Sequence, residues 1–395
     1  MPTSRIVLLG ICFLPTILFA QDEPPKSLDP EITIELFAES PQIKTPTGID
    51  VDSRGRVFAI ESNTHFRPDG YDGHPTDRLL LLTDTDDDGQ CDNVQVFADG
   101  FTHAMSVAVR PEWLRDERGV RSDERKDENR NSLSSLVSTP SSLQLFLATR
   151  RAVWLLEDTD GDNVCDQRTK LAWLETPGDY PHNGLAGFAF DALGWMYFGF
   201  GENLGAEYKL YSREMTSVQP PTSAGEPLQP LTGKAEGGNI YRMRPDGTQL
   251  SHWATGFWNP HASCVDAFGR LFTVDNDPDS RPPCRLLHVI EGGDYGYRFR
   301  NGRKGLHPFT SWNGEVPGTL PMVAGTGEAP SGILAYEHDA FPEKYLGNLF
   351  VTSWGDHRID RFVLKEKGAS FESIAEPFIT GGENFRPVGI ALAPD

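Results

Sequence analysis

The sequence has few basic residues for its size. Its 395 residues include 36 lysines and arginines against 57 aspartates and glutamates, which gives a formal net charge of -21 at pH 7. Nucleic acids and anionic membrane surfaces both attract proteins through basic faces. We therefore expect no nucleic-acid partner, and cations and neutral ligands suit this chain better.

Long hydrophobic runs are also missing. The longest apolar stretch, from Ile6 to Phe19, follows Arg5 and closes at Ala20, just before a polar segment. A run of about 14 residues is shorter than a membrane-spanning helix needs, and its flanks are typical of a secretory signal peptide. An uncleaved anchor is the alternative. We therefore expect a secreted or periplasmic protein without a membrane span after cleavage, divided into a signal peptide (1–20), a linker (21–31) and one folded domain (32–395).

Cysteine is scarce, with five residues in all. Cys12 lies in the predicted signal peptide, and the remaining even number suits an oxidising compartment. Cys264 and Cys284 flank one predicted hairpin and form the preferred disulfide. Cys91 and Cys165 occupy equivalent loops, where they either pair or simply pack. No Cys-x-x-Cys-His sequence occurs, which excludes a covalently attached haem on this chain.

Glycine and proline are abundant, at 39 and 30 residues, and this composition indicates a turn-rich protein. An Asp-x-x-Gly turn between two short apolar strands recurs along the chain, and such turns are typical of β-hairpins. The clearest copies are Thr47–Ile60, Gly187–Gly199 and His261–Asp275. Looser copies pair Met105–Val109 with Leu143–Ala148 and Ser331–Tyr336 with Asn348–Ser353, and Arg386–Leu392 opens a sixth.

Six similar hairpins predict an all-β fold, a six-bladed β-propeller, with an irregular β-sandwich as the alternative. The last copy has no partner strand after it, so the chain is either truncated or completed by an amino-terminal strand at Ile32–Ala38. One strand cannot supply the rest of a blade, and we expect an incomplete sixth blade. The charged stretch from Glu112 to Ser142 is predicted to be a disordered insertion (112–142) between two strands.

Two acidic loops have the spacing of calcium ligands. Carboxylates at positions 1, 3, 5 and 9, with a backbone carbonyl at position 7, can surround one hard cation with oxygen. The alternative is a pair of solvated acidic turns. The predicted ligands are Asp84, Asp86, Asp88, Gln90 and Asp92 in the first loop, and Asp158, Asp160, Asp162, Val164 and Asp166 in the second.

Four further motifs follow one another in the sequence. They are Pro181-His-Asn-Gly184, Gly256-Phe-Trp-Asn-Pro260, Asp275-Asn-Asp-Pro278 and Glu291-Gly-Gly-Asp-Tyr-Gly-Tyr297. In this order they resemble the glucose/sorbosone dehydrogenase family of soluble quinoproteins, which are six-bladed propellers, and most of all the secreted sorbosone dehydrogenase-like proteins of planctomycetes. The resemblance extends from about Gly48 to Asp395 without the charged insertion.

The resemblance implies a pyrroloquinoline quinone (PQQ) cofactor over the central channel, with a calcium ion polarising the quinone. By motif position, His182 is the general base, and a neutral imidazole suits that role. Asn259 matches a cofactor-contacting residue, backbone carbonyls at Asp277 and Pro278 would hold the calcium, and Arg358 is where a basic residue could meet the cofactor's carboxylates. A surface histidine without a partner and an ordinary surface arginine are the alternatives.

These observations favour a PQQ-dependent dehydrogenase that oxidises a sugar or related alcohol and passes electrons to a separate acceptor. A non-catalytic, calcium-stabilised propeller that binds carbohydrate or protein is the second hypothesis. A metal-dependent hydrolase such as a lactonase is the third.

Overall fold

The computed structural model describes residues 23–114, 143–215, 228–234 and 237–394. The predicted signal peptide and most of the charged insertion lie outside these residues. Strands dominate the described chain, which confirms the predicted all-β class. Its helices are short 3₁₀ turns, which include residues 112–114 and the turns η2 (Arg213–Met215), η3 (Phe299–Asn301) and η4 (Glu343–Tyr345). None of the helices in these segments is long and apolar enough to cross a membrane.

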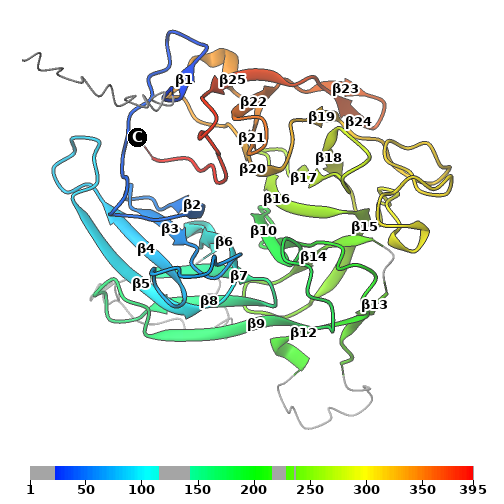
Figure 1. Ribbon diagram of the computed structural model, residues 1–395, viewed down its shortest axis with the longest axis horizontal. Helices are drawn as coiled ribbons and strands as arrows, with labels where there is room; N and C mark the ends of the chain where they lie inside the picture. The colour runs from blue at the N-terminus through cyan, green and yellow to red at the C-terminus, as the bar shows by residue number, and fades with distance from the viewer. Residues whose placement is uncertain (1–22, 115–142, 216–227, 235–236, 395) are drawn as a thin grey trace, which may run out of the picture.

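Five antiparallel sheets are arranged as blades around a common axis (Figure 1). Blade 1 contains β2 (Pro46–Val51), β3 (Val57–Glu61), β4 (Asp77–Thr83) and β5 (Asn93–Phe101). Blade 2 contains β6 (Ala104–Val109), β7 (Leu143–Thr149), β8 (Ala152–Asp158) and β9 (Gln167–Glu175), with β12 (Tyr208–Ser212) and β13 (Leu231–Gly233) added at its outer edge. Blade 3 contains β10 (Leu185–Phe190), β11 (Met196–Phe200), β14 (Gly238–Met243) and β15 (Ser251–Phe257).

The last two complete blades follow the same order. Blade 4 contains β16 (Asn259–Val265), β17 (Leu271–Asn276), β18 (Cys284–Val289) and β19 (Ala324–Thr326). Blade 5 contains β20 (Pro330–Ala335), β21 (Leu349–Ser353), β22 (Arg358–Phe362) and β25 (Glu376–Thr380), with β1 (Lys26–Ser27) at its outer edge. A separate ribbon pairs β23 (Lys365–Lys367) with β24 (Ser370–Glu372). The first strand of each blade lies nearest the axis, where it contacts the first strand of the next.

The predicted hairpins form because each Asp-x-x-Gly turn is closed in the same way. In blade 1, the Asp52 carboxylate accepts hydrogen bonds from the backbone N–H groups of Arg54 and Arg56, at 3.0 Å each. The aspartates that open the turns of blades 3 and 4 accept the equivalent two bonds. The glycine that ends each turn has a φ of 75–80°, a region that favours glycine; these glycines are Gly55, Gly194 and Gly269.

Apolar clusters between successive blades form the core. Phe58 and Phe97 of blade 1 pack with Leu145 of blade 2, and similar clusters join blades 2 and 3, 3 and 4, and 4 and 5. Each sheet therefore buries a face against every blade that lies next to it.

The ring closes differently between blades 5 and 1. Residues 386–392, the sixth copy of the pattern, lie there without forming a strand (Figure 1). Thr352 Oγ1 donates to the Val388 carbonyl at 2.7 Å, and a Cβ on Gly389 would lie 2.9 Å from the Ile49 nitrogen. The described residues thus contain five blades, and the predicted count of six is not confirmed.

The prediction of an amino-terminal strand at Ile32–Ala38 is wrong. Ile32 instead packs against the outer core of blade 5, and the Phe37 carbonyl accepts a hydrogen bond from Cys91 N–H of blade 1 at 2.8 Å. The short strand β1, inside the expected linker, pairs with β25. The chain before β2 therefore runs from blade 5 to blade 1 along their outer sides.

The predicted Cys264–Cys284 disulfide is also wrong, because both thiols are free. Cys264 pairs across the sheet with Phe272, which pairs with His288, four residues along β18 from Cys284. Four residues span about 13 Å of strand, which is far beyond the reach of a disulfide. Cys91 and Cys165 are free as well and pack in apolar clusters, the second of the two alternatives.

Candidate active site

Loops from neighbouring blades bring histidines together on one face of the propeller. His65 follows β3, and His182 precedes β10. The Nε2 atom of His65 lies 3.3 Å from Nδ1 of His182, and the ring of His103, which precedes β6, is 6.2 Å from that of His65. The exposed ring of Phe66 is 5.1 Å from the His182 ring. A histidine pair with an aromatic neighbour therefore lies where blades 1, 2 and 3 meet.

A buried carboxylate fixes the loop that carries His65. Asp77 is fully buried and accepts hydrogen bonds from the backbone N–H groups of Asn63 and Thr64, at 2.6 and 2.8 Å. Its second oxygen accepts the N–H of Ala104 at 2.7 Å. One side chain thus holds the end of β3 and the start of β6, which places His65 and His103 on the same face.

Burial and a nearby cation keep these imidazoles neutral. The pKa of His65 is lowered to about 4, mainly by burial, with smaller contributions from His182 and Arg150. Burial and Arg150 also lower the pKa of His182, and the same two causes act on His103. Neutral imidazoles can accept a proton at pH 7.

Arg150 also fixes the loop before His182. Its guanidinium Nη1 donates to Asp179 Oδ1 at 2.8 Å, and Nη2 donates to the Pro181 carbonyl at 2.9 Å. The Arg150 side chain is buried, and its Nε has no hydrogen-bond partner among the described residues. This arginine therefore keeps a positive charge beside the histidine pair.

Asn259 lies next to the backbone of His182. Its Nδ2 donates to the His182 carbonyl at 3.3 Å, and Nδ2 of the fully buried Asn183 reaches the Trp258 carbonyl at 3.4 Å. These amides join the loop before β10 to the start of β16. The structure thus brings together two of the residues singled out in the sequence, from blades 3 and 4.

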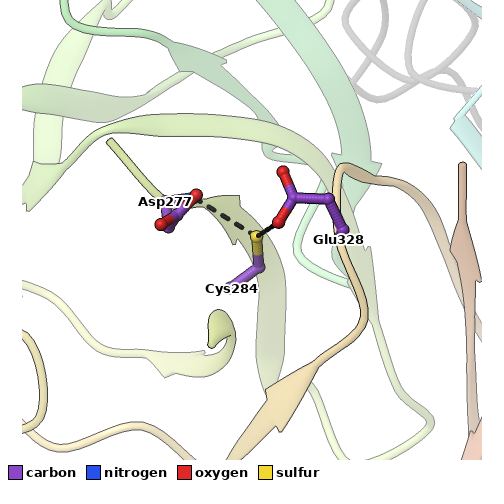
Figure 2. A group of neighbouring side chains, drawn as sticks. All are labelled: Asp277, Cys284 and Glu328. Carbon is purple, nitrogen blue, oxygen red and sulfur yellow. Dashed lines mark hydrogen bonds between the residues drawn. The ribbon is translucent and has the colours of Figure 1, made fainter. Parts of the chain in front are cut away.

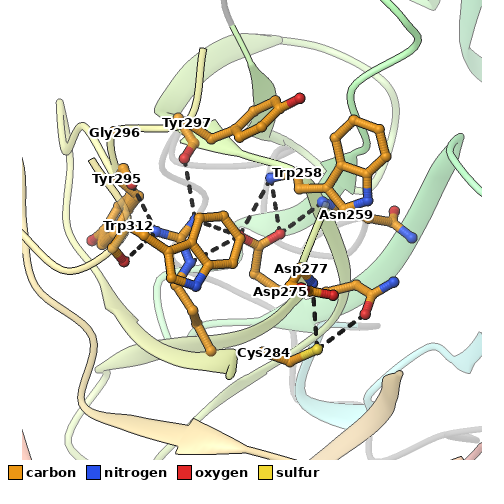
Figure 3. A network of polar contacts seen from close by, with 12 residues as sticks. Trp258, Asn259, Asp275, Asp277, Cys284, Tyr295, Gly296, Tyr297 and Trp312 are labelled. Atoms are coloured by element: carbon orange, nitrogen blue, oxygen red, sulfur yellow. Dashed lines mark hydrogen bonds and ion pairs between the residues drawn. The ribbon is translucent and has the colours of Figure 1, made fainter. Parts of the chain in front are cut away.

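A buried ion pair, which the sequence motifs did not reveal, supports Asn259 (Figure 3). Asp275 and Arg285 are fully buried and form an ion pair between β17 and β18. Asp275 Oδ1 accepts the N–H groups of Trp258 and Asn259 at 3.0 and 2.7 Å. Arg285 Nη1 donates to the carbonyls of Tyr295 and Trp312 at 2.7 and 2.9 Å. The pair connects two motifs that lie apart in the sequence.

The Gly-Gly-Asp-Tyr-Gly motif has a packing role beside this pair. Gly256 has a φ of 89°, and a Cβ there would lie 2.4 Å from the nitrogen of Gly296. The two backbones approach closely enough that Tyr295 N–H bonds to the Thr255 carbonyl at 2.8 Å. Only glycine permits this contact at position 256.

Asp277 and Pro278 follow β17 on the same sheet, since Asn259 pairs with Asn276. Asp277 is buried and approaches Cys284, which the sequence suggested only as a disulfide partner, and Glu328, which the sequence motifs did not reveal (Figure 2). Burial raises the pKa values of both Asp277 and Cys284. The predicted cofactor contact therefore lies beside a thiol and a second carboxylate.

Arg358 does not join this group. It begins β22, the third strand of blade 5, and bonds to Asp356 at 3.3 Å and to the buried Asp360 at 2.9 Å. No contact connects it to His182, Asn259 or Asp277 in the described chain. Two carboxylates already balance the charge of Arg358. The cation that acts on the histidines is Arg150.

The two acidic loops lie at equivalent places, between β4 and β5 and between β8 and β9. In each loop the ligand atoms of three aspartates lie within 4.8 Å of one another. These are Asp84, Asp86 and Asp92 in the first loop, and Asp158, Asp160 and Asp166 in the second. The remaining predicted carboxylates, Asp88 and Asp162, accept backbone N–H groups of Gln90 and Val164 at 2.8 Å.

The loops also share their internal bonds. Asp92 Oδ2 accepts the Thr85 N–H, and Asp166 Oδ2 accepts the Thr159 N–H, both at 2.7 Å. The carboxylates of Asp88 and Asp92 raise the pKa of Asp86. Clustered carboxylates repel one another in this way, and a divalent cation would relieve the repulsion.

The fold and this face define a β-propeller of similar hairpins, with a group of histidines where three blades meet. The chain belongs to the family described as a domain of unknown function, DUF7133, whose model matches residues 26–112 and 138–395. No curated protein matches the sequence significantly.

Solved structures with the same fold include sugar dehydrogenases. The PQQ-bound aldose sugar dehydrogenase of Streptomyces coelicolor is 16% identical, with a TM-score of 0.53 over 94% of this chain and 90% of that one. The apo aldose sugar dehydrogenase of Escherichia coli is 14% identical, with a TM-score of 0.51 over 90% and 92%. The calcium structure of a Trichoderma reesei carbohydrate-active enzyme of family AA12 is 13% identical, with a TM-score of 0.56 over 93% and 92%. These likenesses confirm the resemblance to the soluble quinoproteins at the level of the fold.

Proposed function

We propose that this protein is a PQQ-dependent dehydrogenase that oxidises a hydroxyl group of a sugar or related alcohol. The observation that carries the proposal is the neutral histidine pair, His65 and His182, with the Asn259 amide bonded to the His182 backbone. The sugar dehydrogenases that share the fold support it.

The residues of this face suit an acidic, planar cofactor. Arg150 supplies a buried positive charge, and Arg303 lies 5.5 Å from the ring of Tyr180, to whose hydroxyl it donates at 3.0 Å. Aromatic rings and arginines together favour flat anions. Asn259 would contact the cofactor, and the backbone carbonyls of Asp277 and Pro278 would hold its calcium. When bound, PQQ would supply the two-electron oxidant for the substrate alcohol.

His182 would take the proton that leaves the substrate hydroxyl. Its Nδ1 faces His65 Nε2, so a proton on Nδ1 would be donated to His65 and would leave Nε2 of His182 as the acceptor. Burial and Arg150 keep the ring neutral and ready for this step. In this arrangement His65 would hold the base in the tautomer that has a free Nε2.

Reconstitution with PQQ and calcium tests the proposal. We expect dye reduction with at least one member of a panel of aldoses and alcohols, and a loss of at least about 100-fold in His182→Ala, the usual range for a general base. His338→Ala, on the connection between β20 and β21 of blade 5, is the matched control and should retain activity. Full turnover by His182→Ala would exclude it as the base.

The second candidate is a non-catalytic propeller stabilised by calcium, and the paired acidic loops favour it. Chelator-sensitive stability without any turnover would support this candidate. In either case we propose a secreted or periplasmic location, as the amino-terminal sequence predicts. The dehydrogenase would pass its electrons to a separate protein or small molecule.

A further inference from the structure

Three potential metal ligands of two chemical kinds converge beside the candidate active site. Asp277 follows the second strand of blade 4, Cys284 begins the third, and Glu328 lies on the connection from blade 4 to blade 5. Their ligand atoms lie within 4.8 Å of one another (Figure 2). We propose that the Cys284 sulfur and the carboxylates of Asp277 and Glu328 bind one divalent ion of borderline softness, for which zinc is the best match.

Burial of two of its three members distinguishes this cluster from ordinary acidic surface groups, while Glu328 is exposed. Asp277 is 4% exposed and Cys284 is 1% exposed. No lysine or arginine side chain in the described part of the chain forms an ion pair with Asp277, Cys284 or Glu328. Buried carboxylates are normally paired with a cation or coordinate a metal. A bound divalent ion would supply the missing positive charge.

The sulfur is already held in position for binding. Asp277 N–H donates to Cys284 Sγ at 3.3 Å, and Sγ donates to Asn276 Oδ1 at 3.1 Å. Sγ lies 3.8 Å from Glu328 Oε2. A tetrahedral zinc separates its sulfur and oxygen ligands by roughly 3.6 Å, given bonds of about 2.3 and 2.1 Å. The separation of Sγ and Oε2 therefore exceeds the expected ligand spacing only slightly, and binding would exchange the thiol proton for the metal.

The ligand set selects the metal. Thiolate ligands favour zinc and other borderline ions, whereas calcium takes oxygen ligands alone. The two acidic loops offer only oxygens, each from one short stretch of chain. The backbone carbonyls proposed for the cofactor's calcium are also a different set, so this inference does not rest on the proposed dehydrogenase activity. Three protein ligands leave a fourth position open to water or a ligand.

Titration with cobalt(II), followed by absorption spectroscopy, tests the site. A cobalt–thiolate bond gives a charge-transfer absorption band, and oxygen ligands give no such band. We expect the reduced, full-length chain to develop this band up to one equivalent of cobalt. Zinc should remove the band, and a large excess of calcium should not. This readout requires no PQQ and no substrate, so it can succeed where the activity assay fails.

Variants locate the site. Cys284→Ser should abolish the band, and Glu328→Gln, at an exposed position that should tolerate the change, should weaken cobalt binding at least about 10-fold. Cys264→Ser, in the same blade, is the matched control and should keep the band. The inference is overturned if the wild-type chain shows no band, or if the band persists unchanged in both Cys284→Ser and Glu328→Gln.

Discussion

The acidic loops at the outer side of blades 1 and 2 and the central site are built in opposite ways. Each loop takes all its candidate ligands from nine consecutive residues, and the two loops repeat the same bonds to backbone N–H groups. The central site takes His65, His182 and Asn259 from three different blades. A local site depends on its own spacing, whereas an assembled site depends on the packing of the whole ring.

The loops nevertheless contribute to that ring. Cys91 N–H, in the first loop, bonds to Phe37 of the amino-terminal segment, and Cys165 N–H, in the second, bonds to the Phe97 carbonyl of blade 1, both at 2.8 Å. Gln95 of blade 1 also donates to the Asp162 carbonyl at 3.0 Å. Each loop therefore fastens its blade to the preceding part of the chain, and a bound cation would strengthen that link.

The largest expected effect is at the central site. Arg285→Met would leave Asp275 buried without its partner, and we expect the free energy of unfolding to fall by about 3–5 kcal/mol. Urea denaturation measures the change. Lys367→Met, which removes an exposed ion pair with Glu372, is the control and should cost less than about 1 kcal/mol. The double variant Asp275→Asn/Arg285→Met should recover part of the loss. Equal effects in Arg285→Met and the control would contradict the structural role of the pair.

The contrast between local loops and an assembled site also explains which features could be predicted from the sequence. The Asp-x-x-Gly hairpins and the acidic loops follow from residues within a few positions of one another, so their patterns are visible in the chain. The Asp275–Arg285 pair was not visible, because an arginine within a strand normally points to solvent and its partners include the distant Trp312 carbonyl. Glu328 was missed for the same reason, since it approaches Cys284 only through the packing of blades 4 and 5.

The Cys264–Cys284 disulfide shows the opposite error. Residues that flank one hairpin are close in sequence, yet the register places them at different ends of the sheet. Closeness along the chain predicts contacts only for residues next to a turn. Farther from the turn, the direction and register of the strands determine which residues face each other.

Calcium removal should have an intermediate effect, focused on the acidic loops. A ligand at 100 times its dissociation constant stabilises the fold by about 2.7 kcal/mol per site. We therefore expect excess chelator to lower the melting temperature of the wild-type protein, and Asp84→Asn and Asp158→Asn each to remove part of the calcium response. Asp246→Asn alters an exposed turn outside the loops and serves as the control. A wild-type melting temperature unaffected by chelator would mean that neither loop binds calcium under these conditions.

The smallest expected effect is the contribution of His65 to the pH dependence of the free energy of unfolding. Its pKa is about 4 in the folded protein against 6.5 ordinarily, so between these values the unfolded chain binds more protons. Stability should be fully present above pH 6.5 and decrease as the pH falls toward 4, by less than about 2 kcal/mol because the ring is only half-buried. His65→Asn should flatten this decrease in urea denaturation at several pH values, whereas His338→Asn should not. An unchanged pH profile in His65→Asn would show that the folded protein does not lower the pKa of this ring, and the histidine pair would then lack the neutral character that the proposed base requires.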